Sequence, residues 1–188
     1  QDDLPDSAPT FFFIDIQPNQ LKEFNETVAS IPGQHDLTEA PMLRARISRI
    51  NGETADPLKV APNVRWSLRG ERGLTYRAMP PDDVEIVAGE WWPADYQGPP
   101  LISFSAQLAA GYGIGVGDRL TFNILGREIE GTIANLRNVE FRSLRMEFTT
   151  IFAPGAIEAA PHTILATTKT PTDQASNLVR AVGERFAN

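Results

Sequence analysis

The chain has no cysteine among its 188 residues, and no apolar run in it approaches the length of a membrane-spanning helix. Without cysteine it forms no disulfide and has no thiol nucleophile or thiolate-bound metal. Its most apolar early segment, Phe11–Ile14, is followed at once by Asp15. That segment is too short for a membrane span, which needs about 18 apolar residues, and it predicts no signal peptide. Since the sequence begins with Gln1, we expect an excised segment or a processed form of a longer protein.

Residues that typically carry catalysis are also scarce. The two histidines, His35 and His162, lie far apart and form no HxH or HExxH spacing, so no zinc site is predicted. The serines Ser103, Ser105 and Ser143 stand in no GxSxG turn of the kind that serine hydrolases use. We therefore predict no catalytic residue, no metal ligand and no enzyme activity. Two carboxylates gathered in one cleft would favour an enzyme instead.

A glycine-rich stretch at residues 111–117 resembles a nucleotide-binding loop only superficially. Such a loop follows a strand and opens a helix, so that the helix N-terminus meets the phosphate. Here the glycines follow a predicted short helix capped by Ser105 and precede a predicted strand at residues 119–125. They are expected to end the helix and turn the chain. We predict no bound nucleotide and no other cofactor.

The formal net charge of −7 argues against binding to nucleic acid, or to an anionic membrane, through bulk electrostatics. Arginine nevertheless clusters in two places. One cluster follows an alternating apolar pattern and the other lies later in the chain; they comprise Arg44, Arg46 and Arg49, and Arg137, Arg142 and Arg145. We expect these side chains on the water-facing side of strands, and a local anion site is the alternative.

The periodicity of apolar residues predicts an α+β chain. After a polar linker at residues 1–9, a strand at 10–16 precedes a helix that begins at Pro18 and ends at Gly33, and a strand covers 42–50. The chain closes with a strand at 162–168 and an amphipathic helix. We predict a βαβ subdomain split between the two chain ends, residues 10–54 and 156–188. Residues 55–155 form a β-rich insertion with one short helix.

Two of the three tryptophans, Trp91 and Trp92, are adjacent. Neighbouring side chains of a strand point to opposite faces, so alternation cannot send both rings into one core. We expect a strand end wedged between two subdomains. The alternative is an exposed aromatic anchor for a partner or an apolar substrate, and its candidate surface is Trp66, Trp91 and Trp92.

Three segments together resemble one family. Residues 86–92 read IVAGEWW and are similar to an IVxGxWW segment; residues 108–122 are similar to LAxxLGxxxGDxLTF; and residues 136–155 are similar to LRxVxWxS followed by FxxxFxPG, with Phe141 where tryptophan is common. This ordered combination resembles the extracytoplasmic domains of FtsX/MacB-type ABC transporter permeases, most like the YbbP-like subgroup.

The resemblance implies a porter-like α/β subdomain with an inserted, sabre-like β-rich subdomain. It also implies a periplasmic domain of a bacterial inner-membrane protein, held between transmembrane helices absent from this chain. A cytosolic ATPase subunit would hydrolyse ATP, and ATP-driven dimer closure would move the domain by mechanotransmission to handle or extract a hydrophobic, lipid-like substrate. The further partners implied are a second permease copy or a periplasmic partner protein. The alternative is a docking module that recruits a periplasmic partner protein without touching the cargo.

Overall fold

The computed structural model describes residues 8–140 and 147–186, and the predicted α+β class is confirmed. The described residues contain more strand than helix. Internal contacts divide them into unit 1, residues 8–41 and 162–186, and unit 2, residues 42–140 and 147–161. The division falls between Pro41 and Met42, inside strand β2 (Asp36–Ile50), whereas the sequence-based boundaries are at residues 54 and 156. Most of the predicted linker, residues 1–7, lies outside the described residues.

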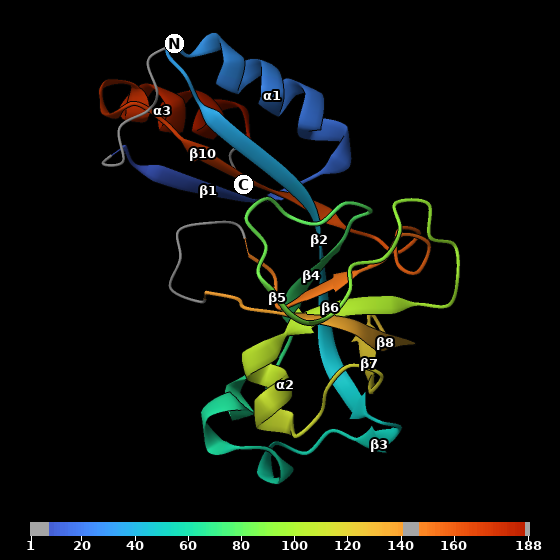
Figure 1. The fold of residues 1–188 in the computed structure, drawn as a ribbon. Helices are drawn as coiled ribbons and strands as arrows, with labels where there is room; N and C mark the ends of the chain where they lie inside the picture. The colour runs from blue at the N-terminus through green and yellow to red at the C-terminus, as the bar shows by residue number, and fades with distance from the viewer. Residues whose placement is uncertain (1–7, 141–146, 187–188) are drawn as a thin grey trace. The chain divides into compact units, whose positions relative to one another are not determined.

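Unit 1 contains both ends of the described chain. Strand β1 (Thr10–Ile16) pairs antiparallel with β10 (Thr163–Lys169), which neighbours β2. Helix α1 (Leu21–Ser30) follows the short η1 (Pro18–Gln20), and α3 (Ala175–Arg185) follows η4 (Thr172–Gln174). Figure 1 shows α1 and α3 beside these strands. The apolar stripes of the helices and the inward face of the strands form one core: Ile16, Phe24, Val28, Ile164, Ala166, Leu178 and Val182.

Unit 2 contains a closed ring of six strands. Around the ring, β2 pairs with β4 (Arg72–Tyr76), β4 with β9 (Thr150–Phe152), and β9 with β6 (Leu101–Ser105). Strand β6 then pairs with β8 (Arg127–Arg137), β8 with β7 (Arg119–Ile124), and β7 returns to β2. Two strands stand outside the ring: β3 (Glu53–Thr54) pairs with β2, and β5 (Ile86–Gly89) pairs with β8.

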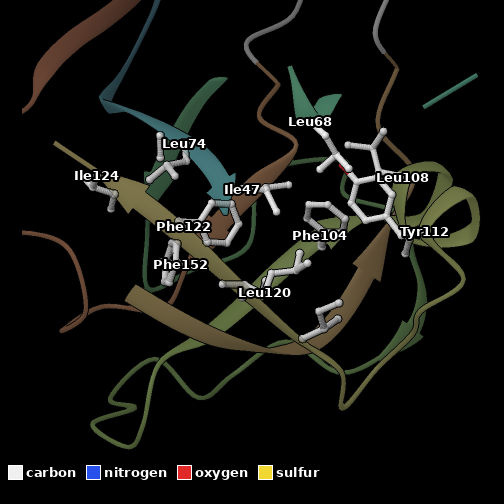
Figure 2. Close-up of a cluster of buried hydrophobic side chains, with 14 of the residues drawn as sticks. Ile47, Leu68, Leu74, Phe104, Leu108, Tyr112, Leu120, Phe122, Ile124 and Phe152 are labelled. Carbon is white, nitrogen blue, oxygen red and sulfur yellow. The ribbon is translucent and has the colours of Figure 1, made fainter. Parts of the chain in front are cut away.

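Every strand of the ring contributes to one buried core, and Figure 2 shows these side chains together. Helix α2 (Ala106–Tyr112) adds Leu108 and Tyr112, and η3 (Pro62–Leu68) adds Leu68; η2 (Pro57–Lys59) packs against η3. The ring strands contribute Leu43, Ala45 and Ile47, Leu74, Ile102 and Phe104, Leu120, Phe122 and Ile124, Ile133, and Phe152. The predicted cap of α2 is confirmed, because the Leu108 amide donates to Ser105 Oγ at 3.2 Å.

Candidate functional site

The tryptophan pair follows a strand that ends at a glycine. Gly89 closes β5 with a φ of +71°, a left-handed conformation that glycine adopts without steric cost. A Cβ at this position would lie 2.2 Å from the carbonyl oxygen of Ala134, so the neighbouring strand β8 leaves no room for a side chain. Residues 90–92 therefore turn out of the strand, and the alternation expected for Trp91 and Trp92 does not apply to them.

Both indoles point to the same stretch of backbone. The Nε1 of Trp91 donates to the Ala78 carbonyl at 2.9 Å, and the Nε1 of Trp92 donates to the Arg77 carbonyl at 3.1 Å. The ring centroids are 4.2 Å apart with an interplanar angle of 35°. Trp92 is only 4% exposed and Trp91 is half-buried. The pair is thus bonded within unit 2, and Trp92 belongs to its packed interior.

Trp66 lies on a different surface, in η3. Its ring is 38% exposed, and the guanidinium of Arg72 stands 5.0 Å from the ring centroid. Trp66 and Arg72 border a hollow over buried side chains such as Leu74 and Phe122, whose lining includes neither Trp91 nor Trp92. The hollow has a volume of about 10 Å³, room for about one water molecule. The structure therefore brings two of the three candidate tryptophans together and leaves Trp66 at a separate position.

A larger hollow begins two residues after the tryptophan pair. It measures about 430 Å³ and lies between the 94–100 segment and residues 154–156. Tyr96 is held there by its hydroxyl, which donates to the Pro99 carbonyl at 2.6 Å, while Gln97 is exposed. A second surface hollow, of about 400 Å³, lies in unit 1 beside Phe11, Val179 and Arg180. Sequence reasoning did not find the first hollow, although Pro154 and Gly155 of the PG motif line it, because the 94–100 segment and residues 154–156 come together only in the folded chain.

The arginine clusters divide between surface and interior. Arg44, Arg46 and Arg49 are exposed along β2, as predicted. Arg137 contradicts the prediction of a water-facing position, because it is 4% exposed. Its β8 position faces strand β6, whose backbone and serine supply hydrogen-bond acceptors that an alternation pattern cannot reveal. Arg142 and Arg145 lie outside the described residues.

The buried Arg137 guanidinium holds four groups together. Its Nε donates to Ser103 Oγ at 2.6 Å, and its Nη2 donates to the carbonyls of Phe148 at 2.8 Å and of Ser103 and Thr149 at 3.3 Å. Ser103 in turn donates to Asn135 Oδ1 at 2.5 Å. Burial lowers the pKa of Arg137 to about 10, so it stays charged at neutral pH. Ser103 is fully buried in this network and is not available as a nucleophile.

Arg137→Lys is expected to lower the free energy of unfolding by about 1–3 kcal/mol, because an ammonium cannot reach both the serine hydroxyl and the carbonyls of residues 148 and 149. Urea titration would measure the change. Arg127→Lys, at an exposed position of the same strand, is the matched control and is expected to be neutral. Equal stabilities of the two variants would contradict a stabilising role for the hydrogen bonds of Arg137.

Glu39 is a second partly buried charged group, in the part of β2 that belongs to unit 1. Burial raises the pKa of its carboxyl, and a hydrogen bond from Asn25 opposes the shift. Within the described residues, Glu39 Oε2 and Asn25 Oδ1 have no hydrogen-bond partner. Burial therefore makes the charged form of this carboxyl less favourable than it is in water.

Glu39→Gln is expected to stabilise the chain at pH 7 and to flatten its pH dependence. A raised carboxyl pKa means that the folded state binds the proton more tightly than the unfolded state does. The free energy of unfolding therefore falls as the pH rises from about 4.5 through the pKa of Glu39 in the folded state. Glutamine carries no charge to desolvate, and its amide can donate to Asn25 Oδ1. Thermal unfolding between pH 4 and pH 8 tests this, and a variant that keeps the wild-type slope would assign the slope to other groups.

One of the two histidines, His35, connects two elements of unit 1. His35 contacts Thr170 Oγ1 through Nδ1 at 3.0 Å and the Ile31 carbonyl through Nε2 at 2.9 Å, which ties α1 to the end of β10. No group of three or more metal-ligating side chains gathers within residues 8–140 and 147–186. None of the helices described there is both long enough and apolar enough to traverse a bilayer.

No family model matches the chain. Over 168 residues, 88% of its length, it is 30% identical to the uncharacterised ABC transporter permease YbbP of Escherichia coli strain K12. The chain is homologous to part of an ABC transporter permease. The predicted relation to such a permease is confirmed, and the chain spans about a fifth of that relative, 19% of its length.

A solved structure is also similar. It is the crystal structure of a domain provisionally assigned to a permease protein of Porphyromonas gingivalis, with 13% sequence identity and a TM-score of 0.48. The match covers 99% of this chain and 88% of that chain.

Proposed function

We propose that the chain is a periplasmic domain of an FtsX/MacB-type ABC transporter permease. In this role it couples ATP hydrolysis by a cytosolic ATPase subunit to the handling of a hydrophobic, lipid-like substrate. The observation that carries the proposal is the homology with YbbP over 88% of the chain. Unit 1 corresponds in the proposal to the porter-like part, assembled from both chain ends, and unit 2 to the inserted β-rich part. The domain itself has no catalytic role and binds no nucleotide.

The 430 Å³ hollow beside residues 94–98 is the proposed point of contact with cargo. It is the more roomy of the two hollows of unit 2 described above, and it adjoins the tryptophan pair in sequence. Photo-crosslinking in the full permease, reconstituted with its ATPase subunit, tests this role. We would replace exposed Gln97 with a photoreactive residue and use Leu125, which is exposed and not part of the lining, as the control position.

ATP-dependent crosslinks to lipid at position 97 and not at position 125 would support the proposal. Equal labelling of both positions, or labelling that persists with an inactive ATPase subunit, would contradict it.

A docking module is the second candidate function. The tight packing around Trp66 favours it, because a hollow of about 10 Å³ admits no lipid chain. In the crosslinking experiment this candidate predicts protein adducts in place of lipid adducts.

The periplasmic location has its own test, which uses the absence of cysteine from the chain. Once any cysteines elsewhere in the full permease are replaced, Gln97→Cys is expected to react with a membrane-impermeant maleimide in cells whose outer membrane is opened. Labelling only after the inner membrane is broken would contradict a periplasmic domain.

A further inference from the structure

One small surface of unit 2 has a charge opposite to that of the chain. Residues 57–72 carry four cationic side chains and one acidic side chain, Glu71, which is a net charge of +3 in a chain of −7. We call the η2–η3 surface the set Leu58, Lys59, Arg65, Trp66, Arg69 and Arg72. The net charge of the whole chain, which argues against anionic partners, therefore conceals a local region that favours them.

Backbone contacts hold this surface together. Arg65 Nε donates to the Pro57 carbonyl at 3.0 Å, which ties η3 to η2. Arg72 Nη2 donates to the carbonyls of Trp66 at 2.6 Å and Arg69 at 3.2 Å while its guanidinium lies over the indole. No carboxylate of the described residues forms a salt bridge with any of these four cations. They remain available to an external anion.

Exposed apolar side chains accompany the charges. Leu58 is 74% exposed, the highest value among the exposed large apolar side chains of the described residues, and Trp66 is 38% exposed. Tryptophan and arginine side by side are typical of the membrane–water interface, where the ring enters the headgroup layer and the cation meets phosphate. Basic residues near an anionic bilayer each contribute to attraction.

An acidic peptide fits this surface less well than a lipid bilayer does. A peptide needs a groove or a free strand edge, and the hollow beside Trp66 has room for about one water molecule. The adjoining strand β4 lies between β2 and β9 in the ring. A bilayer needs only an exposed surface with apolar and cationic side chains.

We propose that the η2–η3 surface binds membranes that carry anionic phospholipid headgroups, with Leu58 and Trp66 entering the interface and Lys59, Arg69 and Arg72 contacting phosphate. This inference goes beyond the transport role and does not depend on it. It assigns η2 and η3, drawn in teal next to α2 in Figure 1, a contact with lipid headgroups.

Vesicle flotation of the 188-residue chain tests the proposal. The chain is expected to float with vesicles of equal phosphatidylcholine and phosphatidylglycerol at low salt, and not with phosphatidylcholine alone. The pair Lys59→Glu with Arg69→Glu is expected to weaken binding at least about tenfold, because it reverses two charges at the headgroups. The control pair, Lys22→Glu with Arg127→Glu, makes the same charge change at exposed positions elsewhere and should keep binding within about twofold.

A second pair of variants tests the apolar contribution. Leu58→Ser is expected to weaken flotation, whereas Leu125→Ser, at a similarly exposed leucine, is expected to leave it unchanged. Circular dichroism checks that each variant is folded. Absence of flotation with phosphatidylglycerol vesicles, equal loss in both charge pairs, or binding to polyglutamate without binding to vesicles would each overturn the proposal.

Discussion

Replacing Trp92 with alanine is expected to lower the free energy of unfolding by about 3–5 kcal/mol. The ring is almost wholly buried, lies against Trp91, and satisfies the Arg77 carbonyl. Its removal leaves a cavity and an unpaired acceptor, and both cost free energy. Urea unfolding followed by far-ultraviolet circular dichroism gives the value directly.

Two comparisons make this result informative. Trp91→Ala is expected to cost less, because Trp91 is half-buried, and Trp66→Ala least, because Trp66 is exposed over a third of its surface. If Trp92→Ala leaves stability unchanged but abolishes activity of the full permease, the ring is an anchor for cargo or partner. The contacts in unit 2 favour the opposite outcome, a structural Trp92.

Gly89→Ala is expected to cost about 3 kcal/mol or more, since it combines a steric clash with a strained backbone. The new Cβ would meet the Ala134 carbonyl at 2.2 Å, and that atom is backbone that cannot rotate away. Relief requires β5 to move off β8, which would shift the hydrogen bonds of both indoles. A fall in stability together with altered near-ultraviolet circular dichroism of the tryptophans is the expected observation.

Gly126→Ala is the matched control. Gly126 has a similar left-handed φ, +86° against +71°, but no atom within 4 Å of the position that a Cβ would take. Its cost is expected to be about 1 kcal/mol, from backbone strain alone. Equal costs at the two glycines would show that the close approach of β8 is unimportant, and the glycine of the IVAGEWW segment would then serve only to turn the chain.

Sequence reasoning succeeded where the signal is local. The strand at 10–16, the helix with Phe24 and Val28 on one face, and the cap at Ser105 follow from periodicity and from hydrogen-bonding side chains within one turn. β2 begins six residues earlier than the predicted strand, at Asp36, because its first part pairs in unit 1. The alternation of that first part is weak, so the sequence does not reveal it.

The failures concern contacts between distant residues. Ring closure depends on the pairing of Thr75 in β4 with Ile151 in β9, and no sequence pattern within either strand predicts this pairing. The sequence pattern predicts a surface position for Arg137, because its hydrogen-bond acceptors, Ser103 and the Phe148 carbonyl, lie close to it only in the folded chain. Strand alternation does not extend to the tryptophan pair, because Gly89 ends β5 before Trp91. Each error comes from extending a local rule past the point where tertiary contact replaces it.

The closed ring also sets an order on how the chain can fold. Strand β9, three residues long, supplies both the parallel pairing with β4 and the antiparallel pairing with β6, and it is the last ring strand to be synthesised. Until residues 150–152 are available, β4 and β6 each have an unpaired edge of the kind that promotes aggregation. Pairings this far apart in sequence are also slow to form. A chain that lacks residues 150–152 is therefore exposed to misassembly and proteolysis at these two edges. Pairing of β9 with β4 and β6 covers both edges.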